Sequence, residues 1–169
     1  QNTWIMMLIH GLGWTLFAAL CAGVIALLLG SVIGVVRTTD HKWLVRLGNA
    51  YVELFRNIPL LVQLFLWFFV IPELLPKAFG SAIKQMPPPW GSFVPAVIGL
   101  GLFTAARVAE QVRAGIQSLP RGQRMAGTAL GLTQAQTYRH VLLPMAFRII
   151  MPPLTSETMN LIKNTSVAL

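Results

Sequence analysis

Four polar side chains stand where the sequence is otherwise apolar, and their types suit the handling of a charged solute. Glu157, Asn160 and Lys163 follow one another at intervals of three residues, so a helix places them on neighbouring faces. Arg107 closes an apolar run, and a guanidinium group can bind a carboxylate through two parallel hydrogen bonds. Ionisable groups at membrane depth usually face a bundle interior or a water-filled pathway. These four residues are therefore candidates for a substrate pathway.

Each of these residues also has a purely structural interpretation. Arg107 could extend its charged end to the membrane interface, or pair with Glu110 three residues further on. Glu157 could form an internal ion pair with Lys163, which would neutralise it and hold helices together. Both interpretations remain open at the level of the sequence.

The sequence contains no catalytic or metal-binding pattern. It lacks the G-x-x-x-x-G-K-[ST] loop that binds ATP, the HExxH metalloprotease motif and the nucleophile elbow of hydrolases. His10, His41 and His140 have no metal-ligand spacing, and Cys21 is the only cysteine. We therefore expect no enzyme activity, no metal and no cofactor in this chain.

The composition indicates a membrane protein. Of 169 residues, 55% are hydrophobic and only 11% are charged, and the mean hydropathy is +0.66. Globular domains carry roughly a quarter charged residues. The net charge of +8 argues only weakly for nucleic acid, because the positive residues gather beside apolar runs, where membrane topology places them.

The apolar runs predict an all-α transmembrane domain that occupies residues 1–169. A run such as 11–36 exceeds the roughly 20 residues that cross a bilayer core. Gly30 and Gly34 in this run form a GxxxG step, which we expect to serve packing within the molecule. The four spans are expected at about 11–36, 57–76, 91–117 and 147–165, with a loop at about 118–146.

Lysine and arginine counts predict the orientation of the chain. Residues 37–56 hold four of them and residues 107–148 hold six, whereas residues 73–90 hold two. Cytoplasmic loops carry the excess of positive residues. The loop at 118–146 is therefore expected in the cytoplasm, and the N-terminus outside.

The basic loop is predicted to fold as two helices that meet at a glycine. Small residues follow Arg124 in a short helix to Leu130, and Gly131 ends it. The sequence 133–136 fits a capping box that begins a second helix, which Pro144 is expected to stop at the membrane. This element could dock onto a protein, or lie as an amphipathic connector on anionic lipid.

The loop resembles the EAA loop of bacterial ABC importer permeases. The resemblance is carried by Met-Ala-Gly-Thr-Ala-Leu-Gly-Leu at 125–132 and Leu-Leu-Pro at 142–144. Residues 51–63 and 160–166 are similar to polar amino-acid permeases, and residues 71–76 and 103–113 look most like glutamate/aspartate permeases.

This resemblance implies the ABC type I importer permease fold, with a fifth span beyond the C-terminal end of a chain truncated at both ends. It also implies a bacterial inner-membrane subunit that moves amino acids, with glutamate or aspartate favoured, by alternating access. The implied partners are two ATP-binding subunits, which carry ATP and Mg²⁺, a second permease and a periplasmic substrate-binding protein. The residues expected to couple to the ATPase are Met125, Ala126, Gly127, Ala129, Leu130, Gly131 and Leu132.

The sequence departs from the family at one position of the loop. The family usually has Glu where this chain has Met125, which puts in doubt the polar contact that the Glu makes. The small residues remain, so the docking shape is expected to survive. The alternative function is a non-transporting membrane scaffold or small channel whose basic loop binds lipid or another partner.

Overall fold

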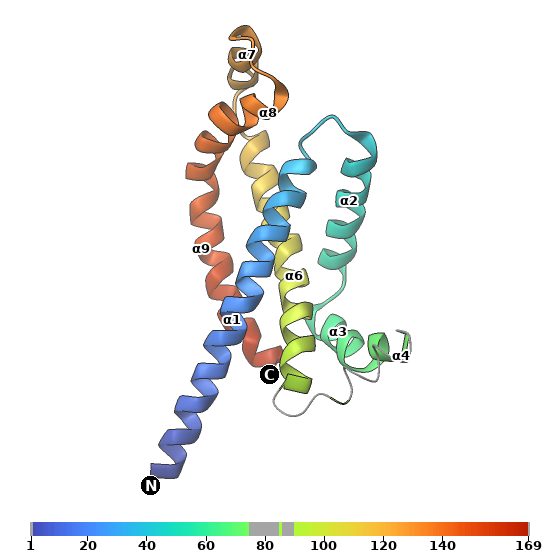
Figure 1. Cartoon of the computed structure of the whole chain (residues 1–169), viewed down its shortest axis with the longest axis vertical. Helices are drawn as coiled ribbons and strands as arrows, with labels where there is room; N and C mark the ends of the chain where they lie inside the picture. The colour runs from blue at the N-terminus through green and yellow to red at the C-terminus, as the bar shows by residue number, and fades with distance from the viewer. Residues whose placement is uncertain (1, 75–84, 86–89, 169) are drawn as a thin grey trace.

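The chain folds into a bundle of long helices with a smaller helical element at one end. The computed structural model describes residues 2–74, 85 and 90–168. The long helices are α1 (Asn2–Val36), α2 (Lys42–Asn57), α6 (Trp90–Gln117) and α9 (Leu143–Ala168). Figure 1 shows these four helices running along the long axis, with α7 at the end farthest from the N-terminus. The all-α fold predicted from the sequence is confirmed, since the described residues contain no strand.

Short helical segments connect the long helices. The chain between α2 and α6 contains α3 (Leu60–Phe65), the π-helix η1 (Leu66–Val70) and α4 (Ile71–Leu74). The chain between α6 and α9 contains α7 (Arg121–Ala129), α8 (Gln134–Thr137) and the π-helix η2 (Tyr138–Leu142).

Helix α6 is the centre of the bundle. In its most apolar stretch 67% of the residues are buried, compared with 28% in α1. Gly30 and Gly34 of α1 lie against it: a Cβ atom on either glycine would come within 2.7 Å of the Cβ of Val108 or Val112. The glycine step therefore serves packing within the molecule, as predicted, because only glycine allows the two backbones to approach this closely.

Among the described residues, two helices are long and apolar enough to cross a membrane, namely α1 and residues Ser92–Gln117 of α6. The number is three if the bent pair Lys42–Asn57 and Leu60–Val70 counts as one span. Helix α9 has 26 residues, and it includes the span expected at 147–165, but it is more polar and carries Arg148, Glu157 and Lys163. The first half of α1 exposes large apolar side chains such as Trp4 and Leu8, and Figure 1 shows it extending beyond the other helices. This surface is suited to contact with lipid or with another apolar chain.

Within the span expected at 57–76, residues 60–74 are helical, as α3, η1 and α4. Just before this stretch the chain bends by 101°, between Lys42–Asn57 and Leu60–Val70. Ile58 is extended, with φ −97° and ψ 124°, because the proline that follows disfavours the helical region. The side chain of Gln63 stabilises the bend, because its Nε2 donates to the carbonyl oxygens of Phe55 and Ile58, at 2.8 and 2.9 Å. Pro76 and most of the expected outer loop lie outside the described residues.

The helix after the basic loop is not stopped by Pro144, contrary to the prediction. The π-helix η2 leads directly into α9, and Pro144 is the second residue of α9. A proline removes one backbone hydrogen bond and its ring clashes with the carbonyl four residues earlier, which here belongs to His140 in η2. The wider π-turn moves that carbonyl away, so the helix continues. Pro72 follows η1 at the same distance.

Candidate functional site

The predicted elbow forms at the end of the bundle. Helix α7 ends at Ala129, and Gly131 adopts a left-handed φ of +75°, which favours glycine. The capping box is present: Thr133 Oγ1 accepts from the Gln136 N–H at 3.2 Å, and Gln136 Oε1 accepts from the Thr133 N–H at 2.9 Å. We call the segment 121–137 the elbow. Its helix starts three residues earlier than Arg124, the start expected from the sequence.

Gly127 holds the two arms of the elbow together. It is buried, and a Cβ atom at this position would lie 2.6 Å from both Cγ2 and Oγ1 of Thr137. The Leu132 N–H also donates to the Gly127 carbonyl at 3.0 Å, closing the turn. Helix α7 therefore sits directly on α8, with no room for a side chain between them.

The elbow is fastened to α1 through a buried tyrosine that sequence reasoning did not single out as functional. Tyr138 Oη donates to the carbonyl oxygen of Thr38 at 2.9 Å and lies 2.8 Å from Thr38 Oγ1. Arg124 of α7 packs its guanidinium group over the Tyr138 ring, 5.5 Å from the centroid. Thr38 lies in the turn after α1, two residues beyond Val36, so these contacts join α7 and η2 to the end of α1.

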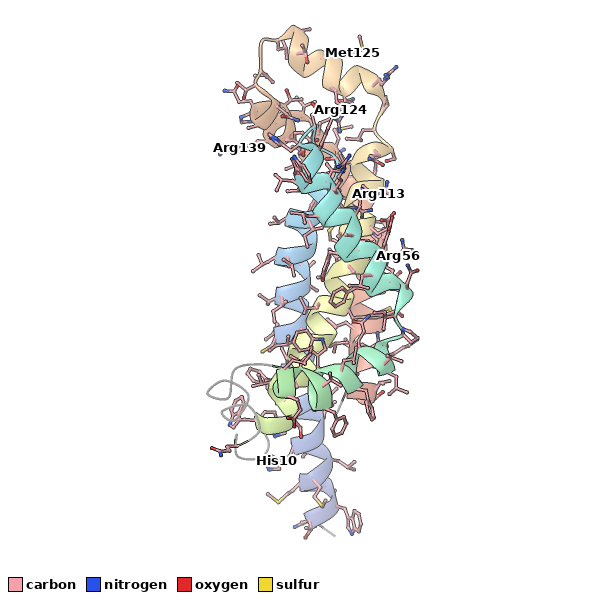
Figure 2. All side chains as sticks on the ribbon, turned by 90° about the vertical axis from the view of Figure 1, so that its right-hand side faces the viewer. His10, Arg56, Arg113, Arg124, Met125 and Arg139 are labelled. Carbon is pink, nitrogen blue, oxygen red and sulfur yellow. The ribbon has the colours of Figure 1, made fainter. Side chains whose placement is uncertain are left out.

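The outer side of the elbow is apolar and exposed. Met125 is 68% exposed and Leu130 is 76% exposed, although both are large apolar side chains. Ala126 and Ala129 beside them are exposed too. Figure 2 shows Met125 at the tip of the molecule, at the opposite end from His10. The element thus presents a thin apolar surface that projects from the bundle, as a docking element requires.

Glu157 is the buried polar centre within the bundle. Its side chain is 7% exposed and accepts from Arg107 Nε at 3.1 and 3.0 Å on its two oxygens. Gln111 Nε2 donates to the same carboxylate at 2.9 Å. Glu157 also lines a largely apolar cavity of about 330 Å³ between α1, α6 and α9.

The structure brings Arg107 and Glu157 together but leaves the other two predicted pathway residues apart. Asn160 is half-buried and Lys163 is exposed on α9, and Lys163 forms no ion pair with Glu157. The interpretation that Lys163 neutralises Glu157 is therefore wrong. So is the pairing of Arg107 with Glu110, because α9 supplies a carboxylate that the sequence spacing could not place.

Glu110 instead binds arginines from α2, from α6 and from the turn after α1. Arg37 Nη1 lies 2.8 Å from Glu110 Oε2, and Arg113 donates to both Glu110 oxygens. Arg56 Nη1 is more distant, at 3.8 Å. The Arg37 Nε group donates to Asn49 at 2.7 Å. Sequence reasoning missed this cluster because its members come from residues 37, 56 and 110–113, and no local spacing connects them.

Comparison with known proteins decides the family. Residues 26–169 match the family described as "Binding-protein-dependent transport system inner membrane component". The chain belongs to this family. It is therefore a membrane-spanning permease subunit of an ABC importer, and the ATPase activity of such importers resides in a separate subunit.

The permease is similar over nearly its whole length to permeases of amino-acid importers. It is 54% identical over 165 residues to the glutamate/aspartate import permease protein GltJ of Escherichia coli K12, covering 93% of this chain and 67% of the relative. It is 37% identical over 161 residues to the probable glutamine ABC transporter permease protein GlnM of Bacillus subtilis, covering 95% and 69%. The predicted recognition as an ABC permease of the polar amino-acid type is confirmed.

Solved structures show the same fold. A crystal structure of an amino acid ABC transporter with histidines matches 99% of this permease and 72% of that chain, with a TM-score of 0.81 and 30% identity. Inward-facing structures of the MetNI methionine ABC transporter match with a TM-score of 0.79 at 23% identity, which shows the fold alone. The predicted type I importer permease fold is confirmed.

Proposed function

We propose that this permease carries glutamate and aspartate across the bacterial inner membrane. The observation that carries the proposal is its 54% identity, over 93% of its length, to a glutamate/aspartate import permease. The polar centre within the bundle supports it. Arg107 uses Nε to neutralise Glu157, while its side chain is 45% exposed and its two Nη groups make no hydrogen bond to any described residue. These Nη groups form the fork of donors that binds a carboxylate.

The elbow couples this permease to its ATPase. Its exposed Met125 and Leu130 provide an apolar surface for docking, and Gly127 keeps the two arms close together. Tyr138 passes any displacement of the elbow to the inner end of α1 through its contacts with Thr38. Movement of two docked ATPases would thereby switch the bundle between inward- and outward-open states, which is alternating access.

The assembly contains two ATP-binding subunits, a second permease and a periplasmic binding protein. ATP and Mg²⁺ bind to the ATPase partners, and the permease itself uses no cofactor. The elbow lies in the cytoplasm and the N-terminus lies outside, in line with the excess of positive residues near the elbow. Figure 1 supports this orientation, because the elbow and the N-terminus are at opposite ends of the molecule.

Two measurements test the proposal. The tagged permease, purified in mild detergent, should bring an ATPase with it, and proteoliposomes containing the assembly and its binding protein should accumulate radiolabelled glutamate when supplied with ATP. A permease that remains free of ATPase would favour the scaffold or channel. An assembly that hydrolyses ATP but imports a different amino acid would refute the acidic substrate alone.

A further inference from the structure

One face of α6 is left uncovered by the other helices. Residues 103, 107, 110, 114 and 117 recur at intervals of three and four, so they share a face of the helix. All of them are exposed or half-buried. We call this face the α6 stripe. On other faces α6 contacts α1 through Val108 and Val112, and α9 through Gln111 and Gly115.

Arginines border the α6 stripe at two levels. The first level is the ion pair between Arg107 and Glu157. The second level lies nearer the elbow, where Arg37, Arg56 and Arg113 surround Glu110. Figure 2 shows Arg56 and Arg113 on the same side of the molecule beside α2, with Arg113 closer to the elbow.

The second level has a cavity and an excess of positive charge. A cavity of about 370 Å³ is lined by the three arginines together with Glu53, Asn57 and Glu110. This volume falls within the range of about 300–1,000 Å³ that small-molecule sites occupy. Three guanidinium groups face two carboxylates, so one positive charge is uncompensated. An uncompensated positive charge in a cavity can attract an anion.

Arg56 is the group with capacity to bind that anion. Glu110 already accepts from Arg37 at 2.8 Å and from Arg113, so its two oxygens are engaged. Arg56 remains at 3.8 Å and its side chain is 53% exposed. Glu53 forms no ion pair with any described residue, Arg56 included. A planar guanidinium group held in this way can bind an oxyanion through two parallel bonds.

We propose that this cavity is an oxyanion-binding site that receives the side-chain carboxylate of an acidic amino acid. The carboxylate rests on Arg56, beside Arg113, whose guanidinium group is engaged by Glu110 and Gln117. It does so after it has left the level of Arg107, which places the site on the inner part of the transport path. The choice of substrate rests on the proposed function. The phosphate of an anionic lipid headgroup has the same chemistry, and the experiment separates the two sources.

The test measures equilibrium binding of radiolabelled glutamate to the purified assembly of permease and ATPase. Arg56→Gln should raise the dissociation constant about tenfold, as expected for the loss of a charge-assisted hydrogen-bond pair. The matched control is Arg46→Gln on the same helix, which removes the same charge from a guanidinium group that instead packs over Trp43, 5.4 Å from the ring centroid. It should bind glutamate within about twofold of the wild type, by the usual small effect of surface substitutions.

Glutamine supplies a second control, since it has the same shape without the carboxylate. Its binding should not change in Arg56→Gln. Retained ATP hydrolysis shows that each variant folds and assembles. If Arg56→Gln and Arg113→Gln both bind glutamate like Arg46→Gln and retain their phospholipid, the oxyanion site is overturned.

The second part of the experiment uses mass spectrometry to measure the phospholipid that co-purifies with each assembly. If Arg56→Gln loses phosphatidylglycerol but binds glutamate as before, the claim that the site receives a substrate carboxylate is overturned. The site would then bind the phosphate of a lipid headgroup. Failure of the proposed function is distinguishable, because it appears as a wild-type assembly that imports neither glutamate nor aspartate. The difference in binding between Arg56→Gln and Arg46→Gln would still decide the site.

Discussion

The elbow and the α6 stripe differ in the polarity of the side chains that they present. The elbow presents Met125 and Leu130 to the exterior, is thinned by small residues, and uses its arginine Arg124 to cover a tyrosine ring. The stripe is bordered by ion pairs, centred on Glu110 and Glu157, whose members come from α2, α6, α9 and the turn after α1. An apolar, tightly closed element is suited to docking on a protein, whereas paired charges beside an uncovered helix face are suited to a polar solute. Under the proposed function, coupling and substrate handling therefore occupy separate parts of this permease.

The largest expected effect comes from closing the space within the elbow. In Gly127→Ala the new methyl group would lie 2.6 Å from the Thr137 side chain, so α7 must move off α8. We expect the ATPase to be lost from the purified complex and ATP-driven uptake to fall at least tenfold, an order of magnitude that corresponds to about 1.4 kcal/mol of docking energy.

The matched control is Gly122→Ala in the same helix, where nothing lies within 4 Å of the added atom. It should leave the complex intact, because alanine favours a helix over glycine by about 1 kcal/mol. Equal retention of ATPase by both variants would show that the close contact with Thr137 has no part in docking.

Next in size is the loss of the buried charge in the bundle. Glu157→Gln keeps the shape of the side chain but removes the anion that accepts from Arg107 and Gln111. We expect the permease to lose about 1–3 kcal/mol of stability, read as a lower midpoint of thermal unfolding in detergent. Lys163→Met on the same helix should not change that midpoint, because Lys163 is exposed. A similar loss in both variants would contradict the specific role of the pair.

A smaller effect is expected where the elbow meets α1. Tyr138→Phe keeps the ring under Arg124 but removes the hydroxyl that binds Thr38 and accepts weakly from Arg124 Nη2, at 3.4 Å. The number of amino acids imported per ATP should fall about two- to fivefold, since one buried hydrogen bond contributes about 1 kcal/mol. Tyr51→Phe removes an equivalent hydroxyl, which binds the Leu102 carbonyl at 2.6 Å, away from the elbow. It should leave this ratio unchanged; an equal fall in both variants would remove the case for transmission through Tyr138.

The smallest effect is expected at the position where this chain departs from its family. Met125 is 68% exposed and its side chain is not needed to close the turn, but it is part of the apolar docking surface. Met125→Glu should lower the retained ATPase only about twofold, because Leu130 remains and most single interface side chains contribute less than about 1 kcal/mol. The measurement is the ratio of ATPase to permease after purification. A large gain on introducing Glu would show that a polar contact, and not the apolar surface, governs docking.

The elbow could be predicted from the sequence because its contacts are local. Gly131 supplies the left-handed residue, and the capping box joins Thr133 to Gln136 only three residues apart. Composition and apolar runs likewise predicted an all-α membrane protein. The continuation of the helix through Pro144 was missed, because the π-turn that permits it has no signature in residue types.

The polar partners could be predicted only in part. Arg107 and Glu157 were recognised as candidates, but 50 residues separate them in the sequence, and 73 separate Arg37 from Glu110. Such pairs depend on how helices are arranged around α6, which periodicity does not fix. The bend before Pro59 was not predicted either, because a proline marks where a helix can begin but does not set its direction relative to α2.

The central claim is that this permease forms an ATP-driven importer of acidic amino acids. The most direct measurement is uptake of radiolabelled glutamate into proteoliposomes that contain the permease, its ATPase and its binding protein. The account predicts ATP-dependent accumulation by the wild type, and its loss in Gly127→Ala together with the loss of bound ATPase. Vesicles in which ATP is hydrolysed at the normal rate but neither glutamate nor aspartate accumulates would contradict it.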